Sequence, residues 1–344
     1  MSSKKVVHVG PELSRGGMSS VIQSLISRPP KNWTATCVNT HSDFGPVEKI
    51  RVFLGAIRSI KRVIRDGQVD LAHIHVTHGV SWWRKNILSR VFHKGGIPVV
   101  FHIHSGRFEA FCAGYSGKFV KRELGNNNVS VVLLENRWKH LLSEWIPEDS
   151  RIIRNYPKLI IDRGDRIPGK RIELLLLSRE SDVKGHEFAK NILLQLTKIG
   201  IEARLTITGG VRGVNANDNG SLELLGWVTE NEKIELMRRS DFLLLPSKFE
   251  GSSMSVIEAI CSGLPPIVSE ASLETVEEES LVLSLDSPKE WAERIIDLKR
   301  REKYNHIIRR LEAVREKYSP KRNRKKWGDL YDSIIDSNNS HGLG

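Results

Sequence analysis

The fold is decided by the stretch FLLLPSKFEGSSMSVIEAICSGLPPIVS, residues 242–269. Four apolar residues, 242–245, predict a buried strand, and the Pro, Gly and Ser residues after them predict a turn. A helix is expected to begin in the hydroxyl-rich run 252–255 and to end at Gly263, before a second apolar run opens at Pro266. The order strand, turn, helix, strand is typical of a parallel sheet whose helices cover both faces.

The same alternation runs through the rest of the chain. Strand-like apolar runs are expected at residues 5–9, 71–76, 98–103, 129–134 and 151–153, and again at 172–177, 203–207, 242–245, 266–268 and 281–285. A stretch rich in Pro, Gly, Asp and Arg separates the two series near residues 157–170. We therefore predict an α/β protein of two Rossmann-like, doubly wound domains, residues 1–160 and 170–318, that face each other across a cleft. A last helical pattern, over residues 320–336, is expected to pack back on the first domain.

Composition restricts the compartment and the partners. The 344 residues include three cysteines, far apart, which predict neither a disulfide framework nor a metal knuckle. The amino-terminal residues lack the apolar core of a signal peptide, and no apolar run is long enough to span a membrane. We expect a cytoplasmic protein.

The positive charge is concentrated in the first half. Residues 1–160 hold 24 Lys and Arg against 11 Asp and Glu, a net +13, whereas residues 161–344 hold 29 against 30. Basic residues also fall largely on the polar side of the helical pattern over residues 50–65: Arg51, Arg58, Lys61, Arg62 and Arg65. The WWRK segment of residues 82–85 and the cations Lys118, Lys121 and Arg122 add to them. One hypothesis is a patch that binds anionic lipid headgroups at the inner face of the plasma membrane. The alternative is a solvated helix face.

The turn and helix start of residues 246–258 make a candidate anion site. Backbone N–H groups at a helix start have no partner within the helix, and the helix dipole adds positive potential there. Glu250 precedes the turn and Glu258 lies inside the helix, so the two carboxylates could face one ligand from opposite sides of its phosphates. The alternative is an ordinary strand–helix turn with serine caps and two solvated glutamates.

Glu250 and Glu258, in F-E-G-…-E-A-…-G-L-P, resemble the Glu-x7-Glu signature of family 4 of the glycosyltransferases. These are retaining enzymes that use nucleotide sugars and have the GT-B fold. Further segments that resemble the family's motifs follow in the expected order: residues 8–17, 99–105, 153–157, 177–185, 225–228 and 240–247. The chain departs from the family's usual residues at Ser252-Ser253 and at Ser178.

The resemblance implies a role for each matching residue. Glu258 would hydrogen-bond the donor ribose, and Glu250 would lie near the hydroxyls of the transferred sugar. Arg179 and Lys184 would neutralise the leaving diphosphate, which fixed cations stabilise more in the transition state than in the ground state. His104 would touch the donor sugar beside the reacting carbon. The glycines and the helix start complete the expected donor-binding set: Gly16, Gly17, Gly251, Ser252, Ser253, Met254 and Ser255. For Arg179 and Lys184 the alternative is that they are surface charges.

The histidines raise the question of a metal. His73-x-His75 and His102-x-His104 are His-x-His pairs of the kind that supply zinc ligands, but Thr77 stands where hydrolases with such a motif carry aspartate. The chain also lacks an Asp-x-Asp triplet for a divalent ion. We expect no metal and no other cofactor, and a structural role for His73, His75 and His102.

The sequence thus predicts a retaining, metal-independent hexosyltransferase. It would move a sugar from a UDP- or GDP-sugar to a hydroxyl of a glycan in bacterial polysaccharide synthesis, and we expect that glycan to be carried on a lipid diphosphate. Two alternatives stay open at this point: a GT-B-like sugar-nucleotide epimerase, or a sugar-nucleotide binder without activity. The basic composition also fits a nucleic-acid-binding protein, but no nucleic-acid-binding motif accompanies it, and we expect no such partner.

Overall fold

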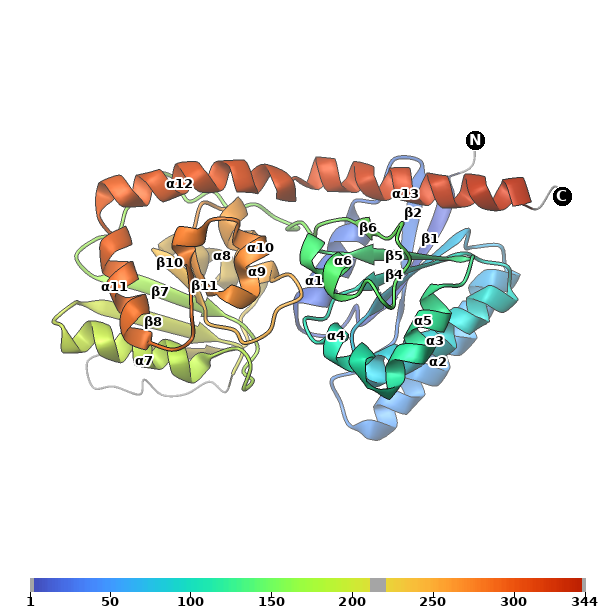
Figure 1. The fold of residues 1–344 in the computed structure, drawn as a ribbon, viewed down its shortest axis with the longest axis horizontal. Helices are drawn as coiled ribbons and strands as arrows, with labels where there is room; N and C mark the ends of the chain where they lie inside the picture. Colours follow the sequence, from blue (N-terminus) through green and yellow to red (C-terminus); the bar gives the residue numbers. More distant parts are fainter. Residues whose placement is uncertain (1–2, 211–220, 342–344) are drawn as a thin grey trace. The chain divides into compact units, whose positions relative to one another are not determined.

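The structure, a computed structural model, describes residues 3–210 and 221–341. The chain divides into two compact units. Unit 1 comprises Met1–Lys158 and Ser319–Gly344, and unit 2 comprises Leu159–Tyr318. Each unit holds a parallel six-stranded sheet with helices on both sides (Figure 1). The predicted α/β class with two doubly wound sheets is confirmed.

The sheet of unit 1 has the strand order β2-β1-β3-β4-β5-β6. Its strands are β1 (Lys4–Gly10), β2 (Trp33–Asn39), β3 (Leu71–Val76), β4 (Val99–Ile103), β5 (Val129–Leu133) and β6 (Arg151–Ile152). Its helices are α1 (Gly17–Ser27), α2 (Pro46–Arg65), α3 (Val80–Lys94), α4 (Phe108–Phe111), the π-helix η1 (Cys112–Ser116), α5 (Gly117–Leu124), α6 (Asn136–Leu141) and α13 (Pro320–His341). All six residues of β3 are buried, as expected for a central strand covered on both faces.

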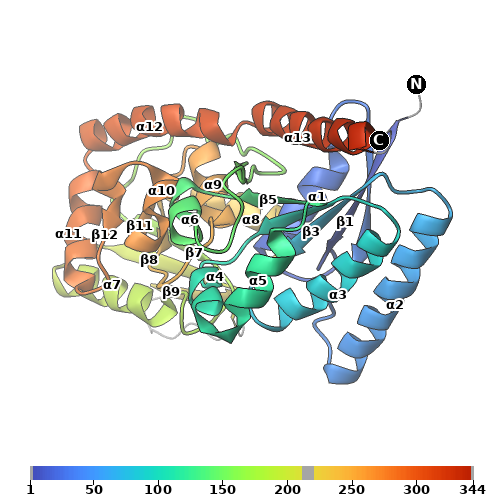
Figure 2. The same ribbon diagram turned by 45° about the vertical axis from the view of Figure 1, so that its right-hand side comes forward.

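The two faces of the unit 1 sheet differ in chemistry. On one face Val9, Ile74 and Phe101 lie side by side in register and form a buried apolar cluster with Trp82 and Leu88 of α3. Helices α2, α3 and α5 cover this face, whereas α13 runs along the other (Figures 1 and 2). On that second face, alternate residues of the same strands are histidines.

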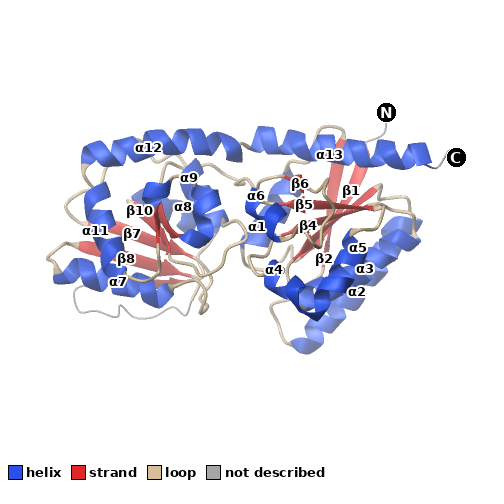
Figure 3. Cartoon of the chain, in the orientation of Figure 1, coloured by secondary structure: helices blue, strands red, loops and turns tan. Residues whose placement is uncertain are grey.

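The sheet of unit 2 has the order β12-β11-β10-β7-β8-β9. Its strands are β7 (Ile172–Leu177), β8 (Ala203–Thr208), β9 (Leu222–Gly226), β10 (Phe242–Leu245), β11 (Pro266–Ser269) and β12 (Val282–Leu283). Its α-helices are α7 (His186–Lys198), α8 (Glu230–Arg239), α9 (Met254–Cys261), α10 (Leu273–Val276), α11 (Pro288–Leu298) and α12 (Arg301–Arg315). The short 3-10 helices η2 (Glu270–Ser272), η3 (Glu279–Leu281) and η4 (Glu316–Tyr318) join some of them (Figure 3).

The strand order reverses once in each sheet. In unit 1 the reversal lies between β1 and β3, and in unit 2 between β7 and β10. Loops leave such a point in opposite directions, which opens a crevice at the carboxyl ends of the two strands where ligands of open α/β sheets bind. The candidate site residues follow β1 and β4 in unit 1 and β7 and β10 in unit 2.

Two strands were not predicted, β2 and β9. Both lie at sheet edges, and their burial alternates or is partial along the strand. Strand β2 reads W-T-A-T-C-V-N, with polar or small residues at most positions. An edge strand needs no continuous apolar run, so the criterion that located the central strands missed both.

The WWRK segment, residues 82–85, which the sequence offered as part of a basic and aromatic patch, is only partly at the surface. Trp82 is fully buried, with its ring centroid 5.4 Å from that of Phe101. Lys85 is also buried. Its ammonium donates to the Thr40 hydroxyl, and burial lowers the pKa of Lys85 to about 7. Trp83, by contrast, is 40% exposed. Positions three apart share a helix face, so Trp82 and Lys85 both turn inward.

Among the described residues, no helix combines the length and apolar character needed to cross a bilayer.

The two neighbouring tryptophans give a matched test of this packing. Trp82→Ala should lower the free energy of unfolding by about 3–5 kcal/mol, because it leaves a cavity in the buried cluster. Trp83→Ala should lower it by only about 1 kcal/mol, because this ring is 40% exposed and loses mainly its contact with Phe119. Urea denaturation followed by circular dichroism measures both. Equal losses in the two variants would contradict this assignment.

Candidate active site

The candidate site of unit 2 is built on the paired strands β7 and β10. Phe242 and Leu243 of β10 lie in parallel register with Leu174 and Leu175 of β7. The chain leaves β7 at Ser178 and leaves β10 at Pro246, so both loops start at the same edge of the sheet. These two loops and the start of α9 carry Arg179, Lys184, residues 250–255 and Glu258.

Three contacts join the two loops. The backbone N–H of Lys248 donates to the carbonyl oxygen of Val183 at 2.8 Å. The Lys184 ammonium donates to Glu250 Oε1 at 2.6 Å. Gly185 has a φ of +71°, and a Cβ added there would lie 2.0 Å from the carbonyl oxygen of Pro246. Glycine at position 185 is therefore required both by the backbone conformation and by the close approach of the second loop.

Lys184 and Glu250 form a largely buried ion pair. Glu250 is 7% exposed, and the Lys184 side chain is 26% exposed. Removing one partner would leave the other charge poorly solvated, which costs more than the pair itself contributes. The sequence placed these residues 66 positions apart and assigned them to different parts of a ligand. The structure brings them into direct contact.

Arg179 lies on the exposed side of the same edge. Its guanidinium carbon is 5.8 Å from the centroid of the Trp227 ring, within the range of a cation–π contact. The loop after β8 approaches closely, since Gly209 has a φ of +85° and a Cβ there would lie 2.1 Å from the Ser178 carbonyl oxygen. Arg179 is thus held on a loop that is packed against a neighbouring strand end.

Helix α9 begins at Met254 with Ser253 as its N-cap residue. The Ser253 hydroxyl contacts the Ser255 hydroxyl at 3.1 Å and makes no capping bond to the helix backbone. Ser252 Oγ is buried and has no hydrogen-bond partner in the part of the chain that the structure describes. The helix start therefore holds backbone and hydroxyl groups of the kind that bind anions.

Glu258 lies about one turn further along α9 and is buried. The Lys233 ammonium of α8 donates to Glu258 Oε1 at 2.9 Å and also contacts Glu230. Burial raises the pKa of the Glu258 carboxyl, and Lys233 opposes that shift. Lys233 is a residue that sequence reasoning missed, because nothing in its helix distinguishes it from a surface lysine.

In unit 1 the predicted residues follow β1 and β4. Gly17 begins α1, and Gly16 precedes it with a φ of +136°, a conformation that favours glycine. His104 follows β4 directly and is partly buried, and its backbone N–H donates to the Val76 carbonyl oxygen at 2.9 Å. Gly16, Gly17 and His104 all belong to unit 1.

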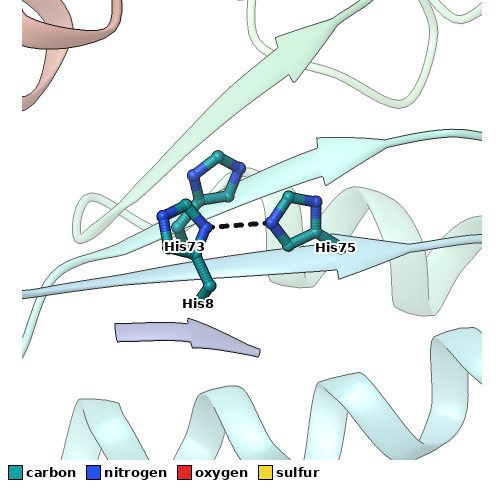
Figure 4. A group of neighbouring side chains, drawn as sticks. All are labelled: His8, His73 and His75. Carbon is teal, nitrogen blue, oxygen red and sulfur yellow. Dashed lines mark hydrogen bonds between the residues drawn. The ribbon is translucent and has the colours of Figure 1, made fainter. Parts of the chain in front are cut away.

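His104 belongs to a network of five histidines on one face of the sheet. His8 Nδ1 lies 3.0 Å from His75 Nε2, and His75 Nδ1 lies 3.0 Å from His104 Nε2. His73 Nε2 lies 3.1 Å from His102 Nδ1. Figure 4 shows His8, His73 and His75 rising from neighbouring strands. The sequence indicated the two His-x-His pairs, but only the register of β1 against β3 brings His8 beside His73.

Helix α13 adds two aromatic side chains to the network. The Tyr331 hydroxyl lies 2.6 Å from His73 Nδ1, and the Trp327 ring centroid is 4.6 Å from that of His73. Burial lowers the pKa of His8 and of His104 to about 3, and lowers those of His73, His75 and His102 well below their ordinary value. The rings are neutral at physiological pH.

Two trios in this network have ring nitrogens near enough to hold a metal ion: His8 with His73 and His75, and His75 with His102 and His104. In each trio the candidate ligand atoms lie within 4.8 Å of one another. The spacing of the ring nitrogens in each trio is therefore compatible with a bound zinc ion.

Residues 171–301 match a protein-family model described as "Glycosyl transferases group 1". The matched segment spans all six strands of unit 2 and carries Arg179, Lys184, Glu250 and Glu258. Unit 2 thus resembles the group 1 glycosyl transferases. The whole chain is 24% identical to "Putative glycosyltransferase EpsF" of Bacillus subtilis (strain 168), over 86% of this chain and 87% of that protein.

Solved structures resemble the chain over nearly its full length. Sucrose-phosphate synthase from Thermosynechococcus elongatus superposes with a TM-score of 0.70 at 14% identity, over 97% of this chain and 100% of that chain. Anabaena Alr3699/HepE in complex with UDP-glucose gives 0.69 at 12% identity, over 96% and 99%. The chain has the GT-B fold of these proteins.

Two glycines at the ends of α7 test the contact between the loops. Gly185→Ala should abolish nucleotide binding and lower the melting temperature, because its Cβ would collide with Pro246. Gly200 also has a positive φ, of +76°, but a Cβ there would meet open space. Gly200→Ala should therefore cost only the backbone strain, about 1 kcal/mol, and keep nucleotide binding. Calorimetric titration with UDP and GDP distinguishes the variants, and equal loss of binding in both would rule out the packing explanation.

Proposed function

We propose that the chain is a retaining family 4 glycosyltransferase that moves a hexose from a UDP- or GDP-sugar to a hydroxyl of a glycan. The observation that carries the proposal is the junction of β7 and β10. There, Arg179, Lys184 and the uncapped start of α9 face the same sheet edge within the segment that matches the group 1 glycosyl transferases. Cations and backbone N–H groups together suit the diphosphate of a nucleotide sugar.

The reaction needs charge at the leaving group. The bond between the sugar C1 and the diphosphate oxygen breaks, and the diphosphate takes the electron pair. The acceptor hydroxyl oxygen bonds to C1 on the same face, and its proton passes to the departing diphosphate. Lys184 and Arg179 would stabilise the negative charge that develops on the diphosphate. They supply positive charge that a divalent ion would otherwise bring, so we propose a metal-independent enzyme without a further cofactor.

Binding of the donor would change the hydrogen-bond partners of Lys184 and Glu250. A diphosphate oxygen would compete with Glu250 for the Lys184 ammonium. Glu250, released from the lysine, would then accept hydrogen bonds from hydroxyls of the transferred sugar. Glu258 would accept hydrogen bonds from the ribose, with Lys233 holding the carboxylate in place. The ends of β1 and β4, with Gly16, Gly17 and His104, would contribute the remaining contacts to donor and acceptor.

Substitution of each glutamate tests the separate roles proposed for Glu250 and Glu258. Glu258→Gln should weaken the binding of the bare nucleoside diphosphate by about tenfold, as expected for one hydrogen bond to a charged group. Glu250→Gln should leave that affinity within a few fold of the wild type and lower turnover by about 10²–10³, as for a lost transition-state contact.

The measurement is sugar transfer from UDP- and GDP-hexoses to a soluble glycan acceptor, with and without EDTA. Activity should survive EDTA and should require the acceptor. Conversion of the sugar nucleotide without an acceptor would instead indicate an epimerase. Binding without any turnover would indicate a sugar-nucleotide binder. Loss of activity in EDTA with recovery in manganese would refute the role of Lys184 and Arg179 as the only charge supply.

We further propose that the acceptor is carried on a lipid diphosphate and that unit 1 docks on an anionic membrane. Large apolar side chains are exposed on α2, α3, α5 and the segment before α2: Phe44, Val47, Ile50, Leu54, Trp83, Ile87 and Phe119. Trp83 and Phe119 contact each other edge to face, with centroids 5.4 Å apart. Exposed cations, including Arg51 and Lys61, share these helices. Apolar and basic groups on one surface are typical of proteins that lie on anionic bilayers.

Charge reversal tests the docking surface. The triple variant Arg58→Glu, Arg62→Glu, Arg65→Glu should lose binding to anionic vesicles while keeping transfer to a soluble acceptor. A control triple variant on unit 2, Lys170→Glu, Lys198→Glu, Lys289→Glu, makes the same change in net charge and should still bind. Vesicle sedimentation at low and high salt reports the result. Retained sedimentation of the first variant would rule out this surface.

A further inference from the structure

The buried histidines form two separate hydrogen-bonded chains. One runs from His8 through His75 to His104, and the other from Tyr331 through His73 to His102. His8, His73, His75 and His102 are each at most 1% exposed. The rings of His73 and His75 stack with centroids 4.3 Å apart, yet each belongs to a different chain.

In a hydrogen-bonded chain of neutral imidazoles, the position of the proton on one ring determines its position on the next. A neutral ring carries one N–H donor and one bare nitrogen acceptor. His75 uses both nitrogens, one toward His8 and one toward His104, so it must donate to one neighbour and accept from the other. The direction of the hydrogen bond between His75 and His104 determines which ring nitrogen of His104 carries the proton. If Nε2 of His104 accepts from His75, the proton of His104 lies on Nδ1. If Nε2 donates to His75, Nδ1 carries no proton.

We infer that His75, supported by His8, is a positioning residue that holds the ring of His104 and sets its tautomer. The contact occupies Nε2 of His104 and leaves Nδ1 as the nitrogen that can face a ligand. This inference deepens the proposed function, since the ligand would be the donor sugar that His104 is proposed to touch. Residues that hold a functional histidine through its second nitrogen act in this way at other sites.

The charge balance favours hydrogen bonds over a metal ion in this network. Besides burial, the groups that shift the pKa of His73, His75 and His102 are other histidines. A divalent ion bound by neutral rings alone would bring two positive charges into a buried site, which is costly. Among the described residues, no carboxylate contributes to these pKa shifts and could balance that charge. The four contacts of the two chains already use the facing nitrogens. Bound metal is therefore an outcome that would overturn the inference.

Two amide substitutions at His75 separate positioning from packing. An Asn side chain places its polar atoms where Nδ1 lies, and a Gln side chain reaches the position of Nε2. His75→Asn keeps the contact to His104 and loses His8, whereas His75→Gln keeps His8 and loses His104. His75→Gln should lower kcat about tenfold or more, the size of effect seen for residues that orient a histidine. His75→Asn should stay within about threefold, and KM for the donor should change little in both.

The control is His73, which is equally buried and stacks on His75 but lies in the other chain. His73→Asn and His73→Gln should lower the melting temperature without separating in kcat. If either His75 variant fails to fold, the terminal residue offers the same contrast, because His8→Asn preserves the Nδ1 contact and His8→Leu removes it. Equal losses of kcat in the Asn and Gln variants of His75 would overturn the positioning role.

A spectroscopic readout keeps the inference independent of activity. Long-range proton–nitrogen correlation spectra of protein labelled with ¹⁵N-histidine show which ring nitrogen carries the proton. His104 should be a single tautomer in the wild type and in His75→Asn, and a mixture in His75→Gln. That result would support the inference even if no sugar transfer were found, which would refute only the proposed function. A single tautomer in all three proteins, or a stoichiometric metal in elemental analysis of the purified protein, would overturn it.

Discussion

Both candidate sites depend on the pairing of strands that are not consecutive in the chain. Strand β1 pairs with β3 and β7 pairs with β10, and at each of these pairs the strand order reverses. Parallel pairing brings the carboxyl ends of the two strands to one edge, and the reversal sends their loops apart. Without the pairing of β7 with β10, Lys184 and Glu250 would not lie in contact. Without the register of β1 against β3, His8 would not reach His75.

The same constraint explains why unit 1 can bury a polar sheet face. In a strand, successive side chains point to opposite faces, so the residues between the apolar ones of β1, β3 and β4 all reach the second face. An isolated buried polar group costs free energy unless it finds a partner. Adjacent strands supply that partner, because each imidazole has a donor and an acceptor and contacts the histidine two residues beyond its register position on the next strand. A single histidine on this face would be costly, whereas the set satisfies most of its own hydrogen-bonding groups.

The central strands could be predicted from the sequence, because a strand that is buried on both faces is mostly apolar, and even β3, which also buries His73 and His75, keeps four apolar residues of six. The edge strands β2 and β9 could not, since their exposed positions accept polar residues. Helix α3 shows a different limit. A basic and aromatic run appears uniform in the sequence, but the helical repeat turns Trp82 and Lys85 inward and Trp83 outward, and only the packing of α3 on the sheet decides which. Contacts between distant residues, such as Lys233 with Glu258, depend on the tertiary fold and leave no local signal.

The two sites differ in how they hold polar groups, and the difference follows from the charge that each is proposed to meet. The loops of unit 2 hold cations in ion pairs with carboxylates, and such pairs can be exchanged when a ligand brings its own negative charge. The strand ends of unit 1 hold neutral rings whose pKa values burial keeps low, so they stay uncharged near a ligand and interact through oriented hydrogen bonds. A diphosphate requires the first kind of group, and sugar hydroxyls, which both donate and accept, suit the second. The charged pairs of unit 2 and the neutral rings of unit 1 therefore suit ligand groups of different charge.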